Sequence, residues 1–222
     1  MCILAIETAG SQGGVAVLTE QGHVFEITFH APRKHVEILP ICVKSVLEAA
    51  KVKEQELTLI AVDVGPGSFT GLRIGIAFAK ALAQALSLPL VGVRQTEAVG
   101  LPVAAWWPGR VAVWIHDRRE FVYHAWVSQG KVGRESVLKV DKAIEKLRGR
   151  EDVLVVGTGA IEFRRLLKKE APAVLVAGPA LAHPAPAQVA RRGLARYREH
   201  GPDELLDLEP VYIQPPLGNK EA

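Results

Sequence analysis

One run of eleven residues constrains the fold of this chain most: Gly65-Pro66-Gly67-Ser68-Phe69-Thr70-Gly71-Leu72-Arg73-Ile74-Gly75. Residues 57–64 before it are mostly apolar and often β-branched, which predicts a strand buried on both faces. Ser68 is suited to cap a helix, because its hydroxyl can accept from the free amides of the first turn. Gly65 and Gly67 permit backbone angles or close approaches that a side chain would block. The run therefore predicts a strand, a glycine turn and a helix in direct succession.

Two interpretations of this turn stay open. A glycine turn at a helix start can hold an anion on backbone amides, but many such turns only change the direction of the chain. The helix expected over 69–86 carries Gly71, Gly75 and several alanines. Each glycine costs about 1 kcal/mol of helix propensity relative to alanine, so a close contact or a ligand should compensate. That contact lies either inside the fold or across an oligomer.

Composition predicts a globular protein with a substantial core. The chain has 222 residues, of which 49% are hydrophobic. No apolar run reaches the roughly 18 residues of a membrane span, and the start lacks the basic flank of a secretory signal. Cys2 and Cys42 fall in an expected strand and an expected apolar helix. We expect small buried thiols there, in a reducing cytoplasm, because a disulfide framework would need more cysteines.

The charge balance allows contact with nucleic acid but does not require it. The net charge is +3, and basic residues cluster on two expected helices. Solvated helix faces explain such clusters well. A self-sufficient RNA-binding surface is therefore not predicted.

The expected elements define two lobes. For the first we expect strands at 2–7, 13–19, 23–30 and 57–64, and helices at 34–51 and 69–86. For the second we expect strands at 111–115, 121–128, 132–138, 153–156 and 173–176, and helices at 141–148 and 160–169. The fold class is α/β, with mixed sheets flanked by helices in an actin-like (ribonuclease H-like) two-lobe fold. The lobes are 1–100 and a reduced 101–185, with a hinge around Pro102, Pro108 and Gly109; a helix at 186–199 packs back on the first lobe, and 201–222 is irregular.

Three motifs resemble one known family. They are Ile3-Leu4-Ala5-Ile6-Glu7-Thr8, Arg33-Lys34-His35-Val36-Glu37-Ile38-Leu39-Pro40 and the glycine run from Gly65 to Gly75. Together they resemble the bacterial TsaB (YeaZ) family of tRNA threonylcarbamoyladenosine biosynthesis, most clearly over the first hundred residues. The resemblance implies a degenerate copy of the catalytic sibling TsaD within the actin-like ATPase superfamily. It also implies a partner role for TsaD in placing threonylcarbamoyl on the adenosine beside the anticodon of tRNA, together with TsaE, and self-pairing when the chain is alone.

The residues themselves argue against catalysis. An actin-like phosphotransferase has an aspartate at the end of its first strand, whereas this chain has Glu7. The catalytic sibling carries two histidines four residues apart on its first helix, a spacing that suits a metal. Here His35 is followed by Leu39. The sequence therefore assigns no catalytic residue and no metal ligand, and His35 is expected to cap the helix or to lie at an interface.

The first two helices are expected to form the partner or dimer interface. Apolar residues recur at three- and four-residue steps on the first helix, which predicts an apolar stripe. The alternative is that this stripe packs only on its own sheet. The interface residues are predicted to be His35, Val36, Leu39, Val43, Val46, Gly71, Gly75, Phe78, Ala79 and Leu82. We expect Gly75→Leu or Ala79→Arg to abolish pairing while the monomer stays folded.

ATP or ADP is the expected cofactor, held at or beside the partner interface rather than by this chain alone. The residues expected to contact nucleotide or another anion are Thr8, Gly65, Gly67, Ser68, Thr70 and Arg73. Two other functions remain open. One is an independent ATP-dependent phosphotransferase or ATPase that uses Glu7 and Thr8 with the glycine loop. The other is a metallopeptidase, against which the lone His35 argues.

Overall fold

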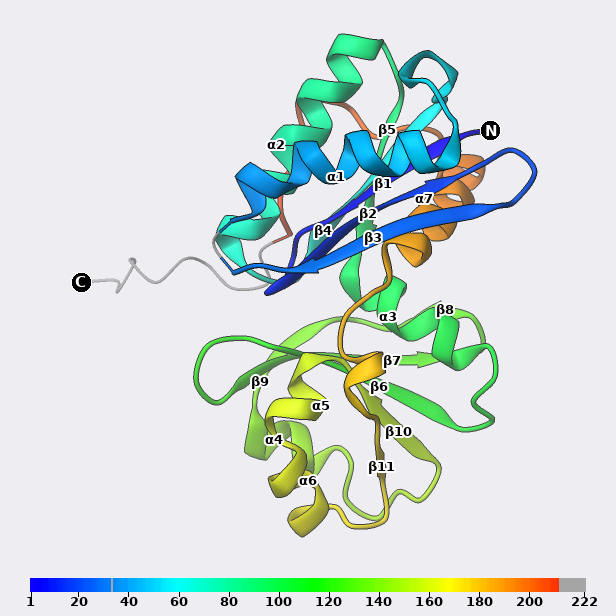
Figure 1. The fold of residues 1–222 in the computed structure, drawn as a ribbon. Coiled ribbons are helices and arrows are strands. Elements are labelled where there is room, and N and C mark those ends of the chain that lie inside the picture. Colours follow the sequence, from blue (N-terminus) through cyan, green and yellow to red (C-terminus); the bar gives the residue numbers. More distant parts are fainter. Residues whose placement is uncertain (33, 212–222) are drawn as a thin grey trace. The chain divides into compact units, whose positions relative to one another are not determined.

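The structure is a computed structural model that describes residues 1–32 and 34–211. The chain divides into two compact units (Figure 1). The first contains Met1–Ala98 and Pro184–Pro210, and the second contains residues 99–183 and Val211. Each unit is built on its own mixed sheet with helices against it, so the predicted α/β fold class is confirmed.

The sheet of the first unit has the strand order β3-β2-β1-β4-β5. Its elements are β1 (Ile3–Glu7), β2 (Gln12–Leu18), β3 (Val24–His30), α1 (His35–Ala50), the 3₁₀ turn η1 (Glu54–Glu56), β4 (Leu59–Gly65), α2 (Phe69–Leu86), β5 (Leu90–Arg94) and α7 (Pro186–His200). Strands β1, β2 and β3 pair antiparallel through short turns. Strands β1, β4 and β5 pair in parallel, because helices α1 and α2 carry the chain back between them.

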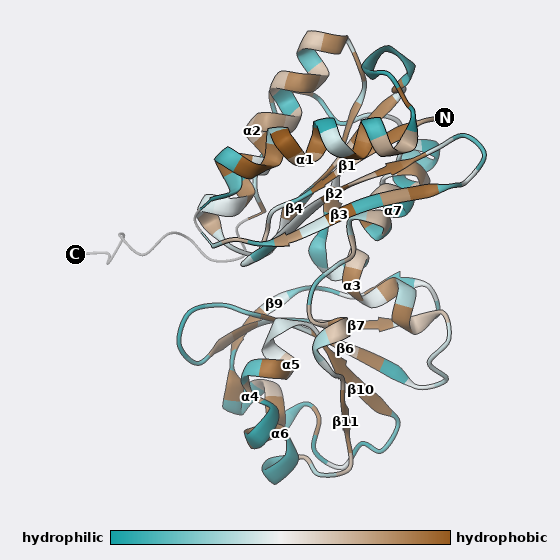
Figure 2. Ribbon diagram, viewed as in Figure 1, coloured by the Kyte–Doolittle hydropathy of each residue, from teal (hydrophilic) through white to brown (hydrophobic). Residues whose placement is uncertain are grey.

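Helices cover both faces of this sheet. Successive side chains of a strand point to opposite faces. Alternate residues such as Ile3, Ala5 and Ala61 therefore form one core with Val189 and Ala190 of α7. Helices α1 and α2 pack on the opposite face (Figure 1). Apolar residues are concentrated along the strands and along both of these helices (Figure 2).

The start of α2 packs closely on the turn between β1 and β2. The Thr8 hydroxyl donates a hydrogen bond to the Gly71 carbonyl at 2.8 Å, and the Ser68 amide donates to the Ala9 carbonyl at 2.7 Å. A Cβ at Gly71 or Gly75 would overlap Thr8. The Ser68 hydroxyl accepts from the Gly71 amide at 3.3 Å, which confirms the predicted helix cap. The glycines thus allow α2 to approach β1 inside the unit.

The second unit has a sheet of order β11-β10-β6-β7-β8, with β9 also paired to β7. Its elements are β6 (Arg110–His116), β7 (Phe121–Ser128), β8 (Lys131–Val132), β9 (Ser136–Lys139), α4 (Val140–Glu145), β10 (Val153–Val156), α5 (Thr158–Glu162), α6 (Arg164–Glu170), β11 (Leu175–Val176) and the 3₁₀ turn η2 (Pro179–Leu181). Helix α3 (Gln95–Ala104) leads from β5 and packs on this sheet through Val99 and Val103.

Several sequence predictions differ from the structure. Residues 132–138 form two strands around a break, and 160–169 forms two short helices that meet at Phe163. Strand β5 and helix α3 were not predicted, because no glycine or proline separates them and α3 has little amphipathic pattern. Pro102 lies inside α3 rather than in a hinge. The tail over 201–222 was predicted to be irregular. Its residues 201–211 form no helix or strand, and residues 212–222 lie outside the described part of the chain.

Helix α2 is unusually apolar for its length. Arg73 and Lys80 interrupt it, yet its 18 residues have a mean hydropathy of 1.2, enough for a membrane-spanning segment by length and composition. In the structure it packs on β1 and β4 through one face, as a core helix does.

Gly75→Ala tests the close approach of α2. Helix propensity alone favours alanine by about 1 kcal/mol. The new Cβ would instead collide with the buried Thr8 side chain. We expect the free energy of unfolding, measured with urea, to fall by about 1–3 kcal/mol.

The matched control is Gly178→Ala, where a Cβ meets open space and φ is −77°. Its effect should stay within about 0.5 kcal/mol. A more stable Gly75→Ala protein would contradict the packing argument.

Candidate partner-binding surface

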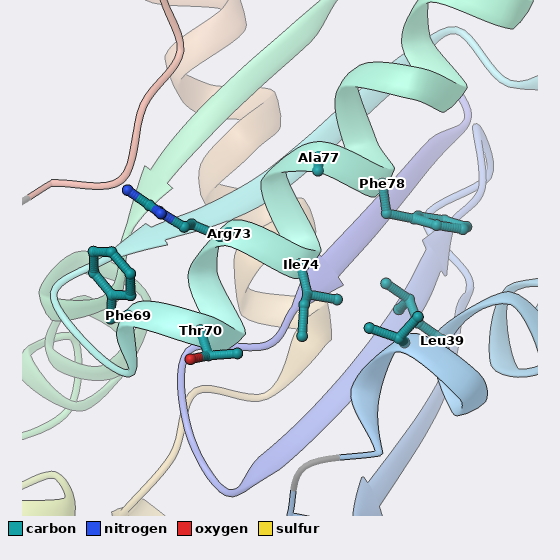
Figure 3. Close-up of a pocket in the computed structure, with 8 residues that line it drawn as sticks. Leu39, Phe69, Thr70, Arg73, Ile74, Ala77 and Phe78 are labelled. Atoms are coloured by element: carbon teal, nitrogen blue, oxygen red, sulfur yellow. The ribbon is translucent and has the colours of Figure 1, made fainter.

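A groove of about 560 Å³ lies between α1 and α2 on the first unit (Figure 3). It is lined by Val36 and Leu39 of α1 and by Phe69, Thr70, Arg73, Ile74, Ala77 and Phe78 of α2. Ile74 and Phe78 are four residues apart, so they share the side of α2 that faces α1. Leu39 points toward both of them and is fully buried (Figure 3).

The rim of the groove exposes large apolar side chains. Val36 is 63% exposed and Phe69 is 47% exposed. Among the described lining residues Arg73 alone is charged, and its guanidinium lies 3.9 Å from the centre of the Phe69 ring. The stacked ring and guanidinium form a flat edge that combines apolar area with a positive charge. Such a surface suits a protein partner with a complementary apolar face.

The structure divides the predicted interface residues into two groups. Val36 is exposed, Phe78 and Leu82 are half-buried, and Leu39 forms the floor of the groove. The others are buried inside the unit: His35, Val43, Val46, Gly71, Gly75 and Ala79. There the apolar stripe of α1 and the small residues of α2 face the sheet, so a direct role of these six in an interface stays a prediction. Gly75→Leu and Ala79→Arg would accordingly disrupt the fold itself.

His35 fixes the start of α1. Its ring packs edge-on against Phe29 with 5.5 Å between centroids, and it hydrogen-bonds the backbone of Gly10. Burial lowers its pKa below the usual range of histidine. It does not cap the helix, since Lys34 occupies the cap position. His35 therefore ties α1 to the turn between β1 and β2.

The glycine loop, for which the sequence suggested an anion site, packs against the backbone of the turn between β1 and β2. A Cβ at Gly67 would lie 2.5 Å from the Ala9 carbonyl oxygen, and that oxygen already accepts from the Ser68 amide. Thr8 and Gly65 are buried. Of the predicted anion contacts, Ser68, Thr70 and Arg73 are exposed and Gly67 is half-buried. The structure thus brings Thr70 and Arg73 to the groove and encloses Thr8 and Gly65.

Two buried carboxyl groups lie at the ends of adjacent parallel strands. Ile6 of β1 is paired with Val62 of β4, so Glu7 and Asp63 follow side by side. One oxygen of Glu7 accepts from the Ala9 amide at 2.8 Å, and one of Asp63 accepts from the Gly65 amide at 2.7 Å. The second oxygen of each has no hydrogen-bond partner among the described residues.

Desolvation governs the ionisation of this pair. Burial raises the pKa of Glu7 well above its usual range, and repulsion from Asp63 adds to that shift. Burial also raises the pKa of Asp63, to about 7, although the Gly65 amide and Arg94 oppose it. Across residues 1–32 and 34–211, no three His, Cys, Asp or Glu side chains gather as metal ligands would. The pair therefore stores a proton near neutral pH.

Sequence reasoning missed several residues of the site. Phe69, Ile74 and Ala77 line the groove, and their spacing on α2 was the available signal. Asp63 could have been noticed in the sequence, because it is an acid within an apolar strand pattern. Its position beside Glu7, however, depends on the register of β1 and β4.

Comparisons with known proteins agree with this architecture. Residues 28–199 match the family TsaD, tRNA N6-adenosine threonylcarbamoyltransferase. TsaB of Escherichia coli is 33% identical over 96% of this chain and 95% of its own length. TsaB of Bacillus subtilis is 38% identical over 45% of this chain and 43% of its own length. The transferase of Streptococcus suis is 37% identical over 41% of this chain, which spans only 32% of that enzyme.

Solved structures show the same fold. YeaZ from Pseudomonas aeruginosa is 26% identical and superposes with a TM-score of 0.77, covering 95% of this chain and 100% of its own. A second P. aeruginosa structure, described as similar to peptidase YeaZ, reaches a TM-score of 0.80 over 96% and 99%. A 2-hydroxyisocaproyl-CoA dehydratase activator from Clostridium difficile, at 7% identity and a TM-score of 0.54, shares the fold alone.

The two mixed sheets with their flanking helices define an α/β protein of the actin-like ATPase fold. Within that class, the near full-length match to the E. coli protein decides the family. The chain belongs to the TsaB (YeaZ) family of tRNA threonylcarbamoyladenosine biosynthesis proteins. The resemblance noted from its sequence motifs is confirmed.

Asp63→Asn tests the buried carboxyl pair. In the folded protein Asp63 has a pKa of about 7, whereas in the unfolded chain it loses its proton near the ordinary aspartate value of 3.8. Between these values the folded state binds more protons, so stability falls as pH rises. The asparagine amide keeps an oxygen for the Gly65 amide but does not titrate.

We expect the advantage in melting temperature of Asp63→Asn over the original chain to grow from pH 4 to pH 7 and then level off. The exposed Asp207→Asn variant serves as the control and should follow the original chain at every pH. An Asp63→Asn protein with an unchanged pH profile would show that this carboxyl group does not titrate in that window.

Proposed function

We propose that this chain is the non-catalytic partner subunit of TsaD in the synthesis of threonylcarbamoyladenosine. The observation that carries the proposal is the exposed apolar groove between α1 and α2. A single compact unit gains nothing from leaving Val36 and Phe69 in water, whereas a second protein could cover them. In this proposal the chain has little or no activity alone and orders an active site that resides on its partner.

The packing of the glycine loop supports a binding role for this chain and a catalytic role for its partner. Gly67 and Gly71 pack closely on the backbone of Ala9 and Thr8, and the Ser68 amide already donates to the Ala9 carbonyl, which leaves less of the loop for a phosphate. Position 39, where the resemblance implies a second helix histidine in the sibling, is the buried Leu39. Both features favour a binding role over phosphoryl transfer or peptide hydrolysis. ATP or ADP would then be held at or beside the partner interface, with Thr70 and Arg73 within its reach.

The match to both TsaB and the TsaD family supports the choice of partner. Because the S. suis transferase shares 37% identity over 107 residues with this chain, the two proteins carry a related segment. Two related segments can pair in a pseudo-symmetric way, which is also how two copies of this chain would pair when alone. In this proposal TsaE also joins the complex, and the chain contacts tRNA as part of that complex. The proposed compartment is the cytoplasm.

The first experiment mixes the full chain with TsaD from the same genome. Size exclusion with light scattering follows the assembly, and threonylcarbamoyl transfer to unmodified tRNA follows activity. We expect a one-to-one complex to replace the homodimer, and transfer to need both proteins. Turnover of ATP by the purified chain alone, lost on Glu7→Gln, would instead favour an independent ATPase.

Val36→Asp tests the groove within that experiment. The residue is exposed in the first turn of α1, where an acidic side chain is compatible with the helix dipole, so the fold should persist. A buried charge at the rim should weaken the complex at least tenfold, or about 1.4 kcal/mol. Isothermal titration calorimetry would measure the affinity.

Ile41→Asp is the matched control. Ile41 lies on the same helix and is 65% exposed, but it does not line the groove. We expect a smaller loss of affinity than for Val36→Asp. Equal affinities for the original chain and Val36→Asp would rule the groove out as the contact.

A further inference from the structure

Leu206 is a large apolar side chain held in water beside α2. It is 84% exposed, the highest value among large hydrophobic residues in the described parts of the chain. It belongs to residues 201–210, which follow α7 and run alongside α2, where Figure 1 draws them in orange to red. A single exposed leucine is common on protein surfaces, so its role depends on what lies around it.

The backbone around Leu206 is fixed by several contacts. The Asp203 carboxylate accepts from the Gly92 amide of β5 at 2.7 Å, and Leu208 packs against Gly92. Lys80 of α2 donates from its Nζ to the Leu206 carbonyl at 2.9 Å. Leu206 is therefore presented by an ordered turn and keeps its outward position at little further cost in entropy.

Leu206 lies beside the same helix, α2, that forms one wall of the groove. Phe78 faces the groove, and Lys80 lies two residues later, about 200° around the helix axis. Leu206 is consequently placed on the flank of α2 opposite to α1. The exposed Arg73 and Ala77 lie on the outward side between the two flanks. One flat partner surface could cover the groove, this side of α2 and Leu206 together.

The charged residues around Leu206 indicate what kind of partner would bind there. Glu204, Asp207 and Glu209 surround Leu206 in sequence, and all three are exposed. These three carboxylates outweigh the Lys80 ammonium, which is bonded to the Leu206 carbonyl, so the rim is acidic and repels the phosphates of a nucleic acid. It attracts a protein surface on which lysine or arginine side chains border an apolar pocket.

We propose that Leu206 is a second anchor of the partner-binding surface, and that TsaD covers it with an apolar pocket rimmed by basic side chains. This inference rests on the proposed function and extends the same surface beyond the groove. The occupant is the transferase, and a second copy of this chain is an alternative outcome of the test.

Leu206→Ser tests the anchor in the full chain. We expect its affinity for TsaD, measured by calorimetry, to fall about tenfold or more. Leu175→Ser is the matched control, because Leu175 is also exposed, at 54%, but lies on β11 of the other unit. Leu175→Ser should bind like the original chain, and circular dichroism should show both variants folded.

The results separate the inference from the function on which it rests. If Leu206→Ser binds TsaD like Leu175→Ser while Val36→Asp does not bind, the groove stands and the second anchor is overturned. If Val36→Asp also binds normally, the groove is ruled out as the contact. The proposed function itself fails only if the original chain does not bind TsaD. If Leu206→Ser loses only self-association in light scattering, the occupant is a second copy and the assignment to TsaD is overturned.

Asp207→Lys tests the basic rim. At low salt the association rate with TsaD should fall several-fold, and the difference should shrink as salt screens the charges. Glu54→Lys, an exposed change of the same charge on η1, should leave the rate unchanged. An unchanged or faster association of Asp207→Lys would overturn the basic rim.

Discussion

The structure of the first unit depends on the close contact between the β1–β2 turn and the first turns of α2. Thr8 donates to the Gly71 carbonyl, and neither Gly71 nor Gly75 leaves room for a Cβ beside it. This contact commits one face of α2 to the sheet. It also closes the glycine loop over Ala9, so the same glycines that resemble an anion-binding turn serve packing here.

Because one face of α2 packs on the sheet, only its other side chains can contact a partner. Gly71, Gly75 and Ala79 lie inside, and α1 likewise turns Val43 and Val46 to the sheet. Some outward residues of both helices, among them Val36, Ile41 and Phe69, are nevertheless apolar, because these helices have hydrophobic residues on more than one face. Burial of such surface is favourable at about 25 cal/mol per Å². A second protein is the natural means of gaining that stabilisation.

The carboxyl ends of β1 and β4 show the other consequence of the closed loop. In many α/β sheets the carboxyl ends of the strands hold a ligand. Here Glu7 and Asp63 occupy that edge, enclosed by protein and paired with backbone amides. Burial disfavours the charged form of both acids, so a proton is retained by the pair near neutral pH.

The sequence by itself determined the succession of strands and helices in the first unit, the cap at Ser68 and the family, because these follow from local patterns and a long glycine motif. It missed β5 and α3, whose boundary lacks a turn residue. Only the tertiary structure decided which apolar residues of α1 and α2 are buried, since both helices carry apolar residues on more than one face and periodicity cannot rank them. The pairing of Glu7 with Asp63 depends on register, and the position of Leu206 depends on contacts with residues more than a hundred positions away. Such long-range contacts leave no local pattern from which they could be predicted.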